Sequence, residues 1–211
     1  MYIPDHFDEP DIKVMQALMR EHPLATLVTL SSAGLNANHI PLHLESDGSE
    51  FGVLRGHVAR ANPLWRDFGK DHDMLAIFQA GNAYISPSWY ASKAETGKVV
   101  PTWNYAVVHA YGAMRIIDDA QWLLKQLQAL TEHNEADFPE PWAVADAPAE
   151  FTEKLLQNIV GIEIAVTRLT GKWKVSQNQP IGNQRSVVSG LKAAGQTDMA
   201  DLVEAKIKPE Q

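Results

Sequence analysis

The chain opens with a helical pattern and then changes to the two-residue period of β-strands. In DIKVMQALMRE (11–21) apolar side chains recur every three or four residues, which predicts an amphipathic helix ending before Pro23. ATLVTL (25–30) is a short apolar, β-branched run, NANHIPLHLE (36–45) alternates, and FGVLRGHV (51–58) is a third extended run. Because short turn sequences separate these three runs, we expect an antiparallel meander.

The rest of the chain continues this mixture of strands and helices. The pattern predicts a short helix over 62–70, strands over 74–80, 83–86 and 99–117, helices over 118–135 and 151–159, a hairpin of 161–169 with 172–177, and a helical tail over 183–207 that breaks at Gly195. Six or seven short strands with few long crossovers favour a mainly β, antiparallel barrel over an α/β sheet. We expect a barrel domain over 1–180 with inserted helices, and a helical extension over 181–211 packed on it.

Composition restricts the class of protein. A length of 211 residues with 45% hydrophobic and 21% charged residues is typical of a globular domain. No apolar run is long enough for a membrane helix, there are no cysteines, and the N-terminal segment has no signal-peptide pattern, so we expect a cytoplasmic protein. The net charge of −8 disfavours binding of nucleic acid through phosphate neutralisation.

GHVARANPLW (56–65) combines groups that suit an anion site. Asn62 followed by proline is a good helix start, whose free backbone N–H groups favour negative charge. Arg60 carries a planar fork that matches phosphate, and Gly56 permits close approach of a ligand. The spacing indicates a strand–turn–helix phosphate site beside His57. It is equally compatible with Arg60 in a surface salt bridge and an Asn-Pro pair that only caps a helix.

A second stretch, residues 84–112, is rich in aromatic side chains. Trp89, Tyr90, Trp103 and Tyr105 offer flat faces with polar tips, which a ligand with a phosphate and a ring system could use. The alternative, favoured for at least two of the four, is that they pack in the core or at a dimer interface.

Other polar clusters predict no metal or hydrolytic site. His39 and His43 share a strand face but stand ~13 Å apart, which is too far for one metal ion. No serine has acid and histidine partners at a recognisable spacing. The segment from Arg185 to Lys208 weakly resembles a helix-turn-helix, but it carries four basic and three acidic residues without a basic stripe, so a helical cap on the barrel is favoured.

Several motifs resemble PaiB-type proteins, a family of FMN-binding negative transcriptional regulators. They are MYIPDHF (1–7), LRGHVARANPLW (54–65), AYISPSWYASKAETGKVVPTWNY (83–105), VGIEIAVTRLTGKWKVSQN (160–178) and a PW…APAEF segment around 141–151. They span almost the whole chain, and the 83–105 block is specific. One difference is QAGN at 79–82, where the family pattern suggests Gln-Gly-Pro.

The resemblance implies an FMN-binding split barrel, the fold of pyridoxamine-phosphate oxidase-like proteins, in which two subunits form a homodimer and each FMN contacts both chains. It implies that HIPL (39–42) lines the isoalloxazine with backbone groups, that the strand around 103–105 crosses the ring, and that the C-terminal hairpin reaches FMN from the partner chain. A lysine near the flavin pyrimidine could stabilise the reduced anion. The expected cofactor-binding residues are His39, Ile40, Pro41, Leu42, Arg55, His57, Arg60, Asn62, Trp103, Asn104, Tyr105, Lys174 and Gln177.

Two functions of different class follow. In the first, FMN sets the state of a dimer that represses transcription, with DNA contact suggested by the resemblance but disfavoured by the net charge. In the second, the protein is an FMN-dependent oxidoreductase on a small substrate. A related alternative is a haem-binding or haem-degrading split barrel, in which His57 or a tail residue could be the axial ligand.

Overall fold

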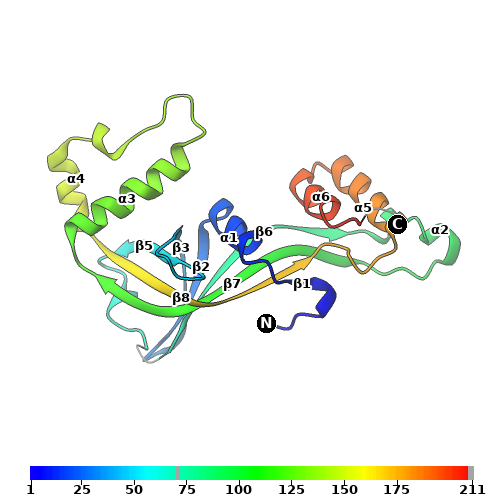
Figure 1. Ribbon diagram of the computed structural model, residues 1–211, viewed down its shortest axis with the longest axis horizontal. Helices are drawn as coiled ribbons and strands as arrows, with labels where there is room; N and C mark the ends of the chain where they lie inside the picture. The colour runs from blue at the N-terminus through cyan, green and yellow to red at the C-terminus, as the bar shows by residue number, and fades with distance from the viewer. Residues whose placement is uncertain (70–71, 209–211) are drawn as a thin grey trace. The chain divides into compact units, whose positions relative to one another are not determined.

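The computed structural model describes residues 1–69 and 72–208, and within them the chain is mainly antiparallel β-structure with flanking helices (Figure 1). The strands are β1 (Asp8–Glu9), β2 (Leu24–Ser31), β3 (Gly34–Pro41), β4 (His43–Glu45), β5 (Val53–Ala59), β6 (Met74–Ile85), β7 (Thr102–Ile117) and β8 (Ile159–Lys174). The α-helices are α1 (Ile12–Glu21), α2 (Lys93–Thr96), α3 (Ala120–Glu135), α4 (Ala149–Leu156), α5 (Ile181–Ala193) and α6 (Thr197–Glu204). Short 3-10 helices are η1 (Asp5–Phe7), η2 (Pro63–Trp65), η3 (Pro87–Trp89) and η4 (Val144–Asp146).

The chain divides into two compact units. The first contains residues 1–18, 79–108 and 170–211, and the second contains residues 19–78 and 109–169. Strands β6, β7 and β8 contribute residues to both units. In the described part of the chain, no helix is both long and apolar enough to cross a bilayer.

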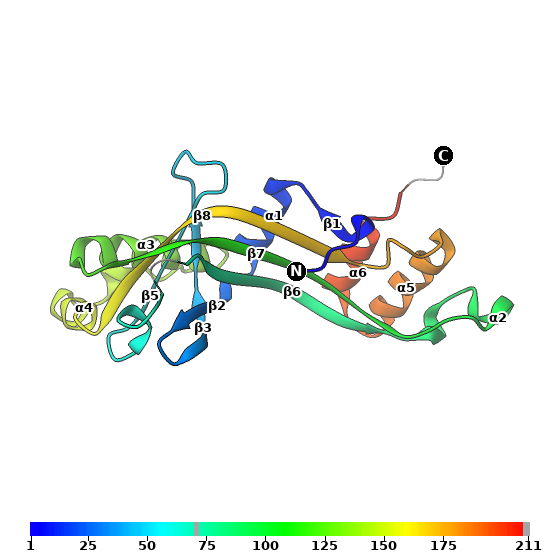
Figure 2. The ribbon, with the colours of Figure 1, turned by 90° about the horizontal axis from the view of Figure 1, so that it is seen from below.

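The second unit contains the closure of the barrel. The strand order is β3-β2-β6-β7-β8-β5-β4, and Figure 2 shows β6, β7 and β8 side by side. The first and last strands of this order, β3 and β4, are consecutive in the chain with only Leu42 between them. One residue therefore joins the two ends of the sheet, which is possible only if the sheet curls round on itself. The predicted antiparallel barrel with flanking helices is confirmed, with eight strands in the described residues.

The predicted meander is wrong at its middle strand. The segment 36–45 is divided at Leu42 into β3, which pairs with β2, and β4, which pairs with β5. The Leu42 side chain is fully buried, and its N–H donates to the carbonyl oxygen of Pro23 at 2.8 Å. The alternating pattern continues through the corner because Ile40, Leu42 and Leu44 all face the core. A sequence pattern alone therefore does not reveal the bend.

Gly56 on β5 lies directly against this corner. A Cβ atom at Gly56 would be 2.7 Å from the carbonyl oxygen of Pro41 and 2.9 Å from Cδ2 of Leu42. These distances are too short for a Cβ atom, so any side chain at this position would force the corner to move. The structure gives this glycine a role in the close approach of the chain itself, while close approach of a ligand at Gly56 stays a prediction.

The predicted C-terminal hairpin is also wrong, because β8 runs unbroken from Ile159 to Lys174. Gly171, expected in a turn, pairs with Glu9 of β1, and a Cβ there would lie 2.8 Å from Sδ of Met15. The glycine permits the N-terminal segment to pack on the strand. Residues 74–86 likewise form essentially one strand, β6, in place of two.

The predicted helices agree with the structure to different degrees. The helix expected over 118–135 is α3, and the Asp119 carboxylate accepts the N–H of Trp122 at 2.7 Å, as its N-cap should. The helix expected over 62–70 contains only the three residues of η2 before the end of the described segment at residue 69. The tail forms α5 and α6, with Gly195 between them at φ 71°.

Candidate functional site

A groove in the second unit brings together five of the predicted cofactor-binding residues. It has a volume of about 350 Å³ and lies between β3 and the end of β5. The lining residues are Asn38, His39, Ile40, Pro41, His57, Val58, Ala59, Asn62 and Ile159. Strand β3 is the first of the strand order, so one of its edges has no neighbouring strand among the described residues. Backbone N–H and C=O groups on such an edge are available to a planar ligand with alternating donors and acceptors.

Asparagine and histidine side chains give this groove a neutral polar surface. Asn62 caps η2 by accepting the N–H of Leu64 at 2.9 Å, and its amide nitrogen donates to Oδ1 of Asn38 at 2.8 Å. His39 is exposed, and its Nδ1 lies 3.1 Å from the hydroxyl of Thr26. Asn62 thus links the β5–η2 turn to β3, which fixes the width of the groove at this end.

His57 is held by a residue that the sequence did not suggest. Its Nδ1 lies 2.9 Å from Oε1 of Gln126, which is buried on α3. An amide oxygen only accepts, so Nδ1 carries the hydrogen and Nε2 of the neutral ring is an acceptor. The Nε2 of Gln126 is buried without a hydrogen-bond partner in the described residues. Such unpaired groups are rare in protein interiors and occur at strained or functional sites.

Arg60, the residue expected to bind phosphate, is engaged within the chain. Its guanidinium forms a bidentate pair with Asp118 at 2.9 and 2.5 Å, and it donates to the carbonyl oxygens of Gln157 and Ile159. Hydrogen bonding to Arg60 holds the pKa of the Asp118 carboxyl below its usual value. The sequence left two interpretations of this segment open, a phosphate site or a salt bridge of Arg60 beside a helix cap. The structure contains the salt bridge and the cap. A phosphate-binding role for Arg60 stays a prediction, and would require sharing or release of Asp118.

The short η2 changes the physical basis of the expected anion site. A three-residue 3-10 helix has almost no aligned dipoles, and its first N–H groups are used or absent. The N–H of Asn62 donates to Ala59, that of Arg60 donates to Asn158, and Pro63 has none. Phosphate at this turn would therefore depend on side chains. The sequence analysis did not select Arg66 as a candidate cation. Its guanidinium lies 4.2 Å above the Trp65 ring, and it has no carboxylate partner in residues 1–69 and 72–208.

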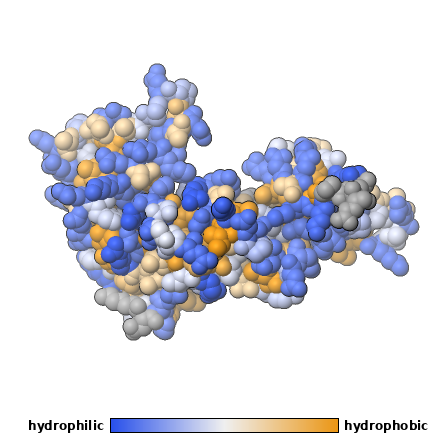
Figure 3. All heavy atoms as spheres, in the orientation of Figure 1, coloured by the Kyte–Doolittle hydropathy of each residue, from blue (hydrophilic) through white to orange (hydrophobic). Residues whose placement is uncertain are grey.

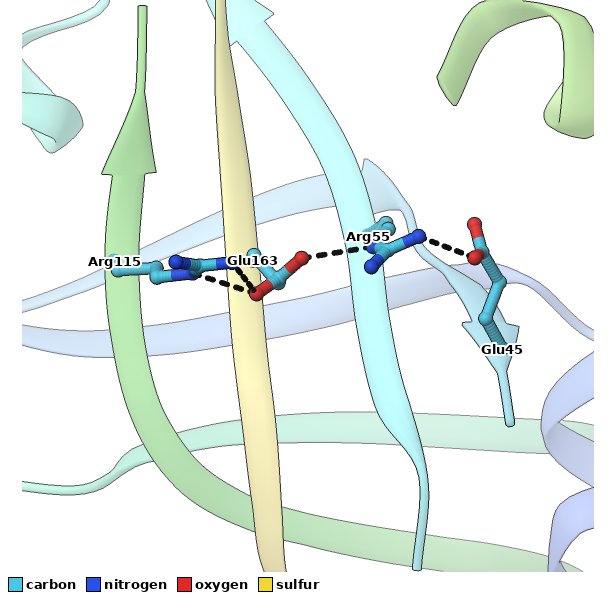
Figure 4. Close-up of polar contacts among 4 residues, drawn as sticks. All are labelled: Glu45, Arg55, Arg115 and Glu163. Atoms are coloured by element: carbon cyan, nitrogen blue, oxygen red, sulfur yellow. Dashed lines mark hydrogen bonds and ion pairs between the residues drawn. The ribbon is translucent and has the colours of Figure 1, made fainter. Parts of the chain in front are cut away.

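Arg55 belongs to a chain of charges across the sheet (Figure 4). Its guanidinium pairs with Glu45 of β4 and, at 2.8 Å, with Glu163 of β8. Glu163 is almost fully buried and also pairs with Arg115 of β7 at 2.6 Å. Each carboxylate and guanidinium is compensated along this chain, so it ties β4, β5, β8 and β7 together. A contact of Arg55 with a cofactor stays a prediction.

The remaining predicted residues lie in the first unit or in the core. Trp103 is 54% exposed, whereas Asn104 is fully buried and donates to the hydroxyl of Ser176 at 2.9 Å. Nζ of Lys174 donates to Thr102 and to the carbonyl oxygen of Trp103, and burial lowers the pKa of this amine. The other two residues of this set in the first unit are Tyr105, which is half-buried, and Gln177, whose amide bonds Val175 and Trp173. Leu42 is in the core of the second unit.

A second cavity in the same unit, named here the apolar pocket, shares His57 and Ile159 with the groove. Its volume is about 340 Å³, and its walls come mainly from α3, α4 and the segment between them. Trp142, Phe151 and Leu155 form much of its surface. In Figure 3 hydrophobic surface is visible among polar atoms over α3 and α4. The sequence pattern predicted the helix that carries Phe151 and Leu155, but it did not predict a pocket beside it.

Comparisons of the sequence with known proteins identify the family of this chain. Residues 1–168 match the family described as "Putative FMN-binding domain". The chain belongs to this family. It is 31% identical over 211 residues, 99% of each chain, to Protease synthase and sporulation protein PAI 2 of Bacillus subtilis. It is also 36% identical to the uncharacterized protein AN0679 of Emericella nidulans, over 92% of each chain. The predicted resemblance to PaiB-type proteins is confirmed.

Solved structures support the fold of this FMN-binding family member. The FAD and heme binding protein from Mycobacterium smegmatis superposes with a TM-score of 0.58 at 16% identity, over 79% of this chain and 73% of that one. The flavocytochrome Anf3 from Azotobacter vinelandii gives a TM-score of 0.58 at 12% identity, over 82% and 72%. At such identities the likeness concerns the fold, a split barrel, and not the ligands.

Proposed function

We propose that this protein binds FMN in the groove between β3 and the end of β5, as one subunit of a homodimer. The observation that carries the proposal is the convergence of an unpaired strand edge, neutral polar side chains and apolar side chains in one groove. The edge of β3 suits the pyrimidine of the ring, Asn38 and Asn62 suit hydroxyl and phosphate oxygens, and the exposed Pro41 suits the ring face. FMN supplies hydride or single-electron transfer, while the chain orients it and excludes water.

Arg60 is proposed to hold the phosphate, in competition with Asp118. We expect Arg60→Ala to weaken FMN binding about ten- to a hundredfold, since a charge-assisted contact is lost. Arg168→Ala, which removes an equal charge from a site that stacks on Tyr111, is the matched control and should leave affinity unchanged. Asp118→Asn should preserve or increase affinity, because it frees the guanidinium.

The first measurement is the visible spectrum of the purified protein after incubation with FMN and desalting, followed by a fluorescence titration of FMN with each variant. Retained flavin absorbance in the wild type, with loss in Arg60→Ala only, supports the proposal. Equal affinity in Arg60→Ala and the wild type would remove Arg60 from the site. Light scattering that gives a mass near the 23.4 kDa monomer would remove the proposed dimer.

Between the two roles considered for the flavoprotein, oxidoreductase chemistry is better supported than direct DNA binding. Helix α6, the second helix of the C-terminal pair, carries Asp198, Asp201 and Glu204 and no basic residue. A recognition helix needs basic and amide side chains toward phosphate and bases. The apolar pocket beside the groove also favours a small substrate. An acceptor-dependent oxidation of a nicotinamide cofactor would support the enzyme, whereas a shifted promoter fragment without such turnover would support a repressor.

A further inference from the structure

We infer that the apolar pocket is a binding site for a neutral aromatic alcohol, a phenol-like molecule whose hydroxyl donates to Nε2 of His57. The inference does not depend on flavin binding, because the pocket is formed mainly by α3, α4 and the segment between them and shares only His57 and Ile159 with the groove. Its volume of about 340 Å³ is within the range of about 300–1,000 Å³ typical of small-molecule sites.

The walls of the pocket favour a flat, apolar ligand. Trp142 from the segment before η4 and Phe151 and Leu155 from α4 are about half exposed in the unliganded chain, at 48%, 55% and 49%. Aromatic side chains that line a concave surface stack well on aromatic ligands. Water against these rings is displaced on binding, which supplies most of the affinity.

The polar group of the pocket sets the orientation of the ligand. His57 is the only titratable side chain in the lining. The contact of its Nδ1 with Oε1 of Gln126 fixes the tautomer, so Nε2 presents a lone pair. In the described residues Nε2 has no hydrogen-bond partner, and a hydroxyl on the ligand would supply one.

The same lining excludes charged ligands. Its other members are aliphatic, aromatic, hydroxyl or amide side chains, and no lysine, arginine or carboxylate is among them. Burial of an unpaired carboxylate in such a pocket is strongly unfavourable, and the net charge of −8 adds to the penalty for an anion. A phenol and the corresponding carboxylic acid should therefore differ greatly in affinity.

The test is calorimetric titration of the full-length chain with 2-naphthol as probe. We expect one site per chain, at least tenfold weaker binding in Phe151→Ser, and at least tenfold weaker binding of 2-naphthoate to the wild type. Phe138→Ser is the matched control, because Phe138 is 59% exposed in the segment between α3 and η4 but does not line the pocket, and this variant should bind 2-naphthol like the wild type.

Three outcomes would overturn the inference. They are absence of 2-naphthol binding to the wild type, equal weakening in both serine variants, and binding of 2-naphthoate as tight as that of 2-naphthol. Light scattering of Phe151→Ser adds a further test: a smaller mass than the wild type would assign this surface to contact between two copies of the chain. Because FMN retention is measured separately, failure of the aromatic site and failure of the flavin site are distinguishable.

Discussion

Closure of the barrel around Gly56 predicts that a single methyl group there destabilises the fold. In Gly56→Ala the new Cβ would meet the carbonyl oxygen of Pro41 at 2.7 Å and Cδ2 of Leu42 at 2.9 Å. The carbonyl belongs to the backbone of the β3–β4 corner, so relief requires movement of the corner itself. Such overpacking costs about 1–3 kcal/mol in free energy of unfolding, and the smaller backbone entropy of unfolded alanine offsets roughly 0.4–1 kcal/mol of this.

Gly81→Ala is the control for the entropy of the unfolded chain. Gly81 lies in β6, where an added Cβ has no atom within 4 Å, so this variant should be as stable as the wild type or slightly more stable. Urea unfolding followed by tryptophan fluorescence gives both free energies, and thermal unfolding should shift by roughly 2–4 °C per kcal/mol. If Gly56→Ala proves as stable as Gly81→Ala, the corner does not press on β5 and the steric role assigned to Gly56 is refuted. FMN affinity should fall together with stability only in Gly56→Ala, because Pro41 also lines the groove.

Three further expectations concern the second unit. Glu163→Gln should lower the free energy of unfolding by about 1–3 kcal/mol, because the charges of two arginines lose their shared partner; an unchanged urea midpoint would contradict this. Asp119→Ala should cost about 1 kcal/mol through loss of the α3 cap, while Asp119→Asn should retain most of it, as circular dichroism melts can test. Burial lowers the pKa of His43, so the unfolded histidine gains its proton first as the pH falls. Folding stability should therefore decrease below pH about 6.5; an NMR titration of His43 with a midpoint above 6.5 would contradict this.

Local signals in the sequence were sufficient to locate several helices and to identify the family. The amphipathic pattern over 118–135 identified α3, and Gly195 marked the boundary between α5 and α6. The same kind of reasoning failed at Gly171, because a Thr-Gly pair looks the same in a turn as in a strand that another segment approaches closely. It also failed at Leu42, since the inward alternation of apolar residues continues through the corner.

The residues of the candidate site were also only partly predictable from the sequence. His39, Asn62 and His57 were selected from the sequence and are brought to one groove, whereas Asn38 and Ile159 were not suggested by any motif. The partner of His57 is 69 residues away, on α3, and only packing of that helix on β5 brings the two side chains together.

The sequence by itself determined that this protein is a mainly antiparallel barrel of the FMN-binding family, because strand periodicity and family motifs are properties of short segments. Tertiary structure alone decided which strands are neighbours, why glycines stand at two close approaches, and that Arg60 faces Asp118. It also formed the apolar pocket from α3, α4 and the segment between them. The physical reason is that pairing, closure and cavity formation depend on contacts between residues distant in the chain, and no local pattern records them.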